Sequence, residues 1–376
     1  MRWIRNLEDV ATAPKRYVVE YELGSECDIP GLLDYEDGAV ICAPMPSPRP
    51  LKGLWLYNLI LTFPDTPPKH NLKADEKGYY FREGVVGELI ALMALFFRAR
   101  FFLVSSRVPA TNPRIAATIK ITHSFVRMTC DAAVHPPLFQ SDKKNFATGF
   151  DVFLNSVRGL EPKRHQRFIL ACHHYSRGIK EVGVDPEMVY IRLVSAIESL
   201  SKDIALTRKD DILEEKRVAT LIQESDFSTE EKQELRSIFE VRKSRKRFVA
   251  FVQQHCAGFF KGGNWRARHL KVRKGSLPKI LDTIYKARSS YLHSGEPMFL
   301  SGIATRQKWD MDPTAEMIID NRRLPGSAKL PYAHFFEGLV RHCLLNYVKA
   351  NASIPAAQTN ASVPPGAQKL MRTGIR

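Results

Sequence analysis

The sequence predicts an α+β protein, in which a strand-rich N-terminal region precedes a mainly helical domain. Two observations support this fold class. The first 80 or so residues contain runs rich in β-branched and aromatic residues, whereas apolar residues recur at helical spacing from about Gly159 onward. The chain has 376 residues, enough for two domains. We therefore expect an N-terminal region at 1–150, a helical domain at 151–350 and a disordered tail at 351–376.

The N-terminal region is expected to contain two strands and one buried helix. The strands are Arg16–Leu23 and Leu54–Phe63. The proline-rich segment 43–50 between them cannot form a helix or a central strand, because proline has no backbone N–H to donate. Glu83–Ser105 is apolar nearly all round, which predicts one long buried helix. Residues 107–150 show no clear pattern.

Helix-capping signals mark the elements of the second domain. Asp185 and Pro186 are an N-cap and a first-turn proline, and Ser228 with Glu231 forms a capping box. Gly295 supplies a helix stop. Together with the apolar spacing, these signals predict helices at about 163–182, 186–206, 229–255, 277–293 and 331–350.

Composition narrows the class of partner and the compartment. A net charge of +16 favours a polyanion, most often nucleic acid, with a membrane surface as the alternative. The six cysteines include no C-x-x-C pair, which is typical of reduced thiols rather than a zinc or redox site. The N-terminus lacks the apolar core of a signal peptide, and the uncharged run Leu89–Phe97 is too short to cross a membrane. We expect a cytoplasmic protein with no membrane partner.

The segment 242–274 contains eleven Lys or Arg and no Asp or Glu. Phe259, Phe260 and Trp265 lie among these cations, and such a mixture suits a phosphate backbone with unstacked bases. The alternative is a solvated helix face followed by a flexible loop. The candidate residues for binding single-stranded RNA are Arg242, Lys243, Arg245, Lys246, Arg247, Arg266, Arg268, Lys271, Arg273 and Lys274.

Arg288 and His293 form the candidate catalytic pair. Arginine can hold the non-bridging oxygens of a phosphate and stabilise the charge that develops on them. Histidine can move a proton from the ribose 2′-hydroxyl or to the leaving oxygen. On a straight helix, residues five apart point about 140° from each other. The two side chains would therefore converge only where the helix unwinds, near Gly295, or across a dimer interface.

Three stretches carry a resemblance to a known family: 167–175 (RFILACHHY), 189–200 (VYIRLVSAIESL) and 288–295 (RSSYLHSG). Over roughly 160–350 they resemble the HEPN superfamily, specifically its ApeA-like branch. The resemblance implies a helical bundle that forms homodimers and an endoribonuclease that needs no metal or cofactor and leaves 2′,3′-cyclic phosphate ends. It also implies a site shared by two protomers, and prokaryotic roles in anti-phage defence or toxin–antitoxin systems.

The same resemblance assigns roles to single residues. Arg288 would bind phosphate, His293 would transfer the proton, and Glu198 occupies a polar position that faces the motif in some members. Ser289 stands where asparagine or aspartate is frequent, and serine has less hydrogen-bonding capacity. Ile197 replaces the usual leucine of the earlier helix.

Two other functions remain open on the sequence. One is a non-catalytic HEPN module that binds nucleic acid or a partner protein. The other is a basic scaffold whose positive surface meets an acidic, antitoxin-like protein or a membrane. No metal is expected, because neither the pair His173 and His174 nor the pair His334 and His342 has a third ligand at suitable spacing. Two further histidines, His255 and His269, flank the basic loop.

Overall fold

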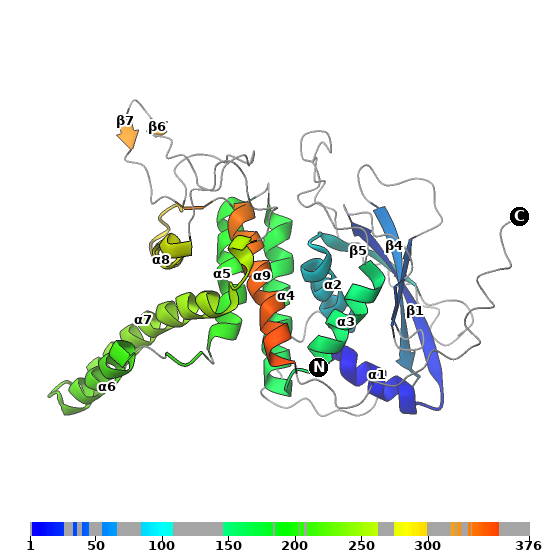
Figure 1. Ribbon diagram of the computed structural model, residues 1–376, viewed down its shortest axis with the longest axis horizontal. Coiled ribbons are helices and arrows are strands. Elements are labelled where there is room, and N and C mark those ends of the chain that lie inside the picture. Colours follow the sequence, from blue (N-terminus) through cyan, green and yellow to red (C-terminus); the bar gives the residue numbers. More distant parts are fainter. Residues whose placement is uncertain are drawn as a thin grey trace, which may run out of the picture.

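The computed structural model shows a mixed protein that is mostly helical and carries a small antiparallel sheet. Helices α1–α3 lie between the sheet and the long helices α4, α5 and α9 (Figure 1). The broad α+β class is therefore confirmed. The structure describes residues 2–25, 33–35, 40–44, 55–65, 84–107, 146–182, 185–202, 204–206, 209–261, 274–298, 317–319, 322–324, 330–331 and 333–352.

The sheet has five antiparallel strands in the order β2-β3-β4-β1-β5. Its two central strands confirm both predicted strands, and Tyr17 pairs with Phe63 in their register. Val19 and Leu23 on β1 and Leu61 on β4 are buried on the face that the helices cover. The strands are β1 (Arg16–Ser25), β2 (Leu33–Tyr35), β3 (Val40–Pro44), β4 (Trp55–Pro64) and β5 (Phe101–Arg107).

One N-terminal prediction needs correction and one agrees with the described residues. Ala43 and Pro44 end strand β3 and pair only with β4, because β2 pairs with β3 at Val40–Cys42, so the described part of the proline-rich segment has a neighbouring strand on one side only. The long helix predicted at Glu83–Ser105 ends early. Helix α2 is Gly84–Phe97, Arg98 follows with a φ of 55°, and the aromatic and β-branched residues after it form β5.

The remaining helices follow the predicted capping signals. Asp185 accepts a hydrogen bond from the backbone N–H of Met188, and Ser228 and Glu231 form the reciprocal capping box. Three helices, α1, α3 and α6, were not predicted, and α5 ends at Ser201 rather than Leu206. The helices are α1 (Arg2–Thr12), α3 (Phe146–Arg158), α4 (Pro162–Glu181), α5 (Pro186–Ser201), α6 (Lys209–Glu224), α7 (Thr229–His255), α8 (Leu277–Ser294) and α9 (Ala333–Asn351).

Short elements complete the described chain. Two 3-10 turns, Phe259–Lys261 and Lys274–Ser276, flank the middle of the basic segment, and β6 (Met317–Ile319) pairs with β7 (Arg322–Leu324). The predicted disordered tail lies outside the described residues, apart from the end of α9. In the part of the chain that is described, no helix is long and apolar enough to cross a membrane. Cys172, Cys256 and Cys343 are buried free thiols, as expected.

One hydrophobic core runs from the sheet into the helical part. It includes Leu59 of β4, Leu92 of α2, Phe168 of α4 and Leu339 of α9. Helix α3 crosses residue 150, where the sequence analysis placed a domain boundary, and core residues lie on both sides of that position. The described residues therefore mark no separation there.

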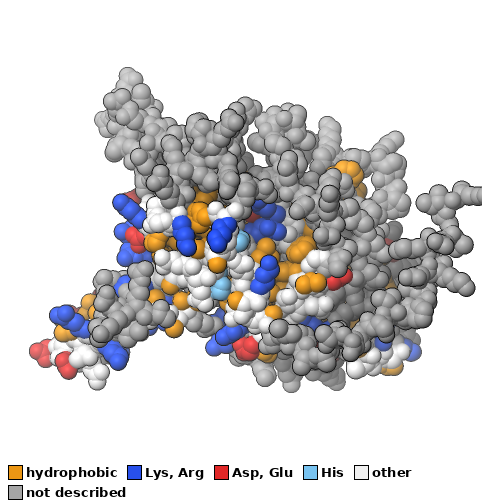
Figure 2. Space-filling model, in the orientation of Figure 1, with side chains coloured by type: hydrophobic (Ala, Val, Ile, Leu, Met, Phe, Trp, Pro, Cys, Tyr) orange, Lys and Arg blue, Asp and Glu red, His pale blue; other side chains and the backbone are white. Residues whose placement is uncertain are grey.

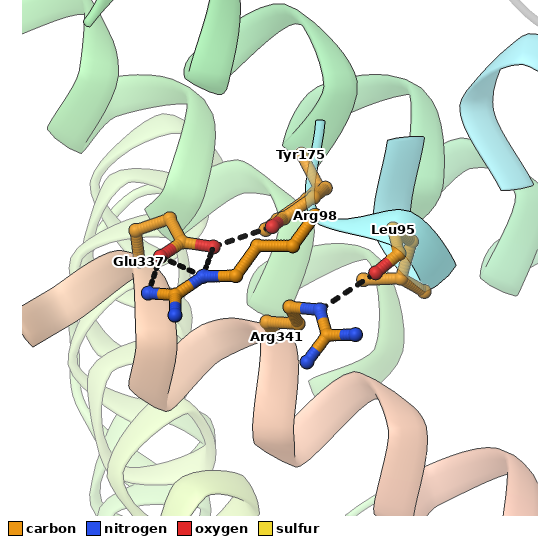
Figure 3. Close-up of polar contacts among 5 residues, drawn as sticks. All are labelled: Leu95, Arg98, Tyr175, Glu337 and Arg341. Carbon is orange, nitrogen blue, oxygen red and sulfur yellow. Dashed lines mark hydrogen bonds and ion pairs between the residues drawn. The ribbon is translucent and has the colours of Figure 1, made fainter. Parts of the chain in front are cut away.

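A buried polar cluster joins α2 to α4 and α9 (Figure 3). The Nε of Arg98 donates to Glu337 Oε2 at 3.0 Å, and the hydroxyl of Tyr175 donates to the same carboxylate. Arg341 donates to the backbone carbonyl of Leu95 at 2.7 Å, which caps the last turn of α2. Glu337 and Tyr175 are fully buried, so this cluster fixes the N-terminal elements to the helices.

Candidate functional site

Helix α8 carries the predicted motif and packs against α5 and α7. Its residue Arg288 points toward α5, where its Nη2 atom lies 3.0 Å from Oε2 of Glu198. The side chains are 20% and 23% exposed, so water screens this ion pair only in part. The structure thus brings together Arg288 and Glu198, two predicted site residues that are 90 positions apart in the chain.

Tyr285 completes this arrangement. Its hydroxyl donates to Glu198 Oε1 at 2.8 Å, and the guanidinium carbon of Arg288 lies 5.9 Å from the centre of its ring. Burial raises the pKa of Tyr285, Glu198 raises it further, and the cations Arg288 and Arg245 oppose the rise. Tyr285 therefore stays a hydroxyl donor at neutral pH. Sequence reasoning missed it, although its position three residues before Arg288 places both on one helical face.

A second carboxylate holds two further cations beside this network. Asp282 on α8 lies 3.1 Å from Nε of Arg245 on α7 and 2.9 Å from Nζ of Lys286. Arg245 belongs to the predicted RNA-binding set, and its partner Asp282 is three residues before Tyr285 and six before Arg288, so the three side chains follow one face of α8. Three helices, α5, α7 and α8, therefore position a group of alternating charges in which cations outnumber acids.

His293 lies in the last turn of α8 and is exposed. The helix remains regular through Ser294, and Gly295 follows in the left-handed conformation, with its N–H bonded to the carbonyl of Tyr291. Unwinding therefore does not turn His293 toward Arg288. Ser289 is half-buried on the same helix. Within one chain, the arginine faces α5 while the histidine faces solvent.

The basic segment is described only in part. Lys243, Arg245, Lys246 and Arg247 are half-buried on α7, and Lys274 is exposed before α8. Arg242 begins that run; its backbone is helical, but its side chain lies outside the described residues. So do the remaining members of the predicted set, which are Arg266, Arg268, Lys271 and Arg273.

The described surface is mixed in charge. On the face shown in Figure 2, lysine and arginine outnumber acids in the middle, whereas the end of the arm formed by α6 and the first half of α7 carries both signs. A positive middle surface suits a phosphate-bearing partner.

The other described histidines are buried or contact rings and backbone carbonyls. Burial lowers the pKa of His165 to about 3 and that of His173 to about 4. His255 is buried against the ring of Phe251, and Nε2 of His342 lies 2.8 Å from the carbonyl oxygen of Ala257. Among the described residues, no group of three His, Cys, Asp or Glu side chains is placed to hold a metal. His269 and the side chain of His334 lie outside the described residues.

Comparison of the chain with protein-family models, with curated proteins and with solved structures finds no match in any of the three. The likeness to HEPN domains therefore rests on the three stretches of residues identified in the sequence. The structure adds the contact between two of them, through Glu198 and Arg288.

Proposed function

We propose that this protein is a metal-independent endoribonuclease of HEPN type that acts in the cytoplasm, in anti-phage defence or a toxin-like stress response. One observation supports the proposal above the others. Arg288 is anchored by Glu198 and by the ring of Tyr285, on the helix where Asp282 holds the cations Arg245 and Lys286, and it lies one and a half helical turns from the exposed His293. An arginine held in a defined position costs less entropy when it binds a phosphate than a mobile one does.

The chemistry needs only the groups of RNA and of the protein. The ribose 2′-oxygen would attack the adjacent phosphorus, forming a 2′-O–P bond while the P–O5′ bond breaks. Histidine takes the proton of the 2′-hydroxyl, or protonates the leaving 5′-oxygen. Arg288 stabilises the charge on the non-bridging oxygens. The products are a 2′,3′-cyclic phosphate and a 5′-hydroxyl.

A second copy of the chain would supply the missing convergence. Arg288 and His293 lie on different sides of a regular helix, so one chain does not direct both at the same phosphate. Two α8 helices brought together would place the arginine of one protomer near the histidine of the other. The proposal therefore includes a homodimer formed through the helical part, with single-stranded RNA as substrate.

The test is incubation of the full chain with mixed single-stranded RNA in the presence of EDTA. We expect cleavage by the wild type and a loss of at least about 100-fold in Arg288→Ala and His293→Ala, because each removes a group required in the transition state. Lys279→Ala, an exposed cation of α8, is the matched control and should cleave normally. Retained cleavage in either folded variant would overturn the proposal.

A non-catalytic module that binds nucleic acid or a partner protein is the second candidate. The observation that favours it is the closed network of Arg288, Glu198 and Tyr285, which also serves to hold α5 and α8 together. This candidate predicts RNA binding without cleavage. Its affinity should fall with salt, with a log–log slope of about −0.7 for each phosphate neutralised. Absence of both binding and cleavage would leave an acidic regulatory partner as the ligand of the positive surface.

A further inference from the structure

The arm formed by α6 and the first half of α7 leaves large apolar side chains exposed. Figure 1 shows it extending away from α4, α5 and α9, and α6 packs chiefly against α7. Among the described side chains of α6, which are those of residues 216–224, only Ile222 is buried. Leu221 is 57% exposed, and Phe227, just after the helix, is 50% exposed. The described part of α6 therefore gains little from packing within the chain, although packing is what stabilises most protein helices.

Two opposite charges flank Leu221 on one side of α6. Arg217 is four residues before it and Glu224 is three residues after it, and this spacing places all three along one line on the helix surface. We call Arg217, Leu221 and Glu224 the arm stripe. The side chains of Arg217 and Glu224 are exposed, and neither forms an ion pair or a hydrogen bond with another described residue. Both charges are therefore open to a partner.

The order of groups in the arm stripe is self-complementary. In two antiparallel copies of α6 whose Leu221 side chains face each other, residues before Leu221 lie opposite residues after it. Arg217 of each copy is then level with Glu224 of the other to within about 1.5 Å, the rise of one residue. A parallel pair would instead place arginine against arginine and glutamate against glutamate, which costs free energy. The charges thus favour the antiparallel, two-fold arrangement.

We propose that the arm binds a second copy of this chain, in an antiparallel contact centred on Leu221 and flanked by two ion pairs between Arg217 and Glu224. The contact covers the exposed leucine of both copies and adds the packing that α6 lacks within one chain. It uses a surface other than α8, whose pairing belongs to the proposed function, and it does not require that RNA be cut. The two contacts form one homodimer if they share its two-fold axis.

Sedimentation velocity of the full chain, without RNA, tests the contact. We expect the wild type to dimerise, and Leu221→Asp to raise the Kd of the dimer at least about tenfold, because two facing carboxylates would have to leave water. Val152→Asp is the matched control, since Val152 of α3 is 62% exposed and lies outside the arm. This control should dimerise like the wild type.

Charge reversal separates the contact from an effect on the folding of α6. Arg217→Glu or Glu224→Arg alone would bring two pairs of like charges together, and each should weaken the dimer about tenfold. An equal mixture of these two variants should form a heterodimer as tight as the wild-type dimer, because both pairs are then of opposite charge. Lys15→Glu, an exposed cation outside the arm, is the matched control and should have no effect.

The outcomes separate this proposal from the proposed function. A monomeric wild type, or arm variants that dimerise as tightly as the wild type, would overturn the arm contact. Failure of the two charge-reversed variants to pair in the mixture would overturn the assigned ion pairs. A dimer that depends on the arm stripe, in a chain that cuts no RNA, would contradict the ribonuclease and support the arm contact.

Discussion

At the scale of single residues, the contacts of Arg288 determine what it can bind. Glu198 occupies only one of its terminal nitrogens in the described hydrogen bonds, and the guanidinium has five N–H donors. A phosphate can therefore bind beside the carboxylate, while Tyr285 keeps Glu198 in place through its other oxygen. The negative charge of Glu198 opposes anion binding, so the neighbouring cations Arg245 and Lys286 contribute to the attraction.

His165 supplies a residue-scale prediction on pH. It is fully buried, and burial followed by the N-terminal charge lowers its pKa to about 3, against about 6.5 in the unfolded chain. The unfolded state therefore binds more protons below pH 6.5, and the stability present above that pH is lost as the pH falls toward 3. When the pH falls from 7 to 4.5, protonation of this histidine in the unfolded chain should lower the free energy of unfolding by about 2–3 kcal/mol.

The variant His165→Leu should remove this part of the pH dependence. Neither ring nitrogen hydrogen-bonds to a described residue, so leucine sacrifices no polar contact. Urea unfolding at pH 7 and pH 4.5 measures the difference. His173 and His174 still respond to acid in both proteins, because their pKa values are also lowered. A variant that loses as much stability as the wild type between these two pH values would show that His165 is not the cause.

Part of the candidate site could be predicted from the sequence, because those residues lie in short stretches of the chain. Arg288 and His293 are visible as a short motif, and Glu198 follows from the resemblance. Tyr285 and Asp282 were missed because their roles depend on contacts across three helices.

At the scale of elements, strong local signals predicted the helix boundaries well. Pro186, the Ser228 capping box and Gly295 act within one turn of the chain, so no distant contact was needed to find them. The end of α2 was missed because Arg98, a residue that rarely takes a positive φ, is held there by Glu337 of α9. Tertiary contact overrode a continuous apolar pattern at that point.

The C-terminal end of α8 allows a prediction at this scale. Gly295 has a φ of 68°, and an added Cβ would meet nothing within 4 Å, so Gly295→Ala tests backbone conformation alone. We expect a loss of about 1 kcal/mol in the free energy of unfolding. Gly275→Ala, which also meets nothing within 4 Å but has no positive φ, is the control and should not lose stability. Equal effects in the two variants would show that the left-handed cap does not stabilise the end of α8.

At the scale of the whole molecule, the cluster in Figure 3 connects segments that are far apart in sequence. Arg98, which follows α2, and Glu337 are 239 residues apart, and Arg341 donates to the carbonyl of Leu95 in the last turn of α2. Through this cluster and the shared hydrophobic core, the strand-rich and helical parts pack against each other in the described residues.

Glu337→Gln tests the connection. The variant keeps the shape of the side chain but leaves the charge of Arg98 without its buried counter-ion. We expect a loss of about 3 kcal/mol in the free energy of unfolding, measured by urea denaturation. Glu234→Gln, at an exposed position on α7, should change stability by less than about 0.5 kcal/mol. A similarly small effect at Glu337 would mean that the cluster contributes little to joining the two parts.

The most direct test of the central proposal is the chemical identity of the RNA ends after incubation of the full chain with single-stranded RNA and EDTA. Mass spectrometry of the fragments distinguishes the possible products. The proposed site predicts 2′,3′-cyclic phosphate and 5′-hydroxyl ends, formed by the wild type and not by Arg288→Ala or His293→Ala. Intact RNA, or fragments with 5′-phosphate ends, would contradict attack by the 2′-hydroxyl and with it the proposed ribonuclease.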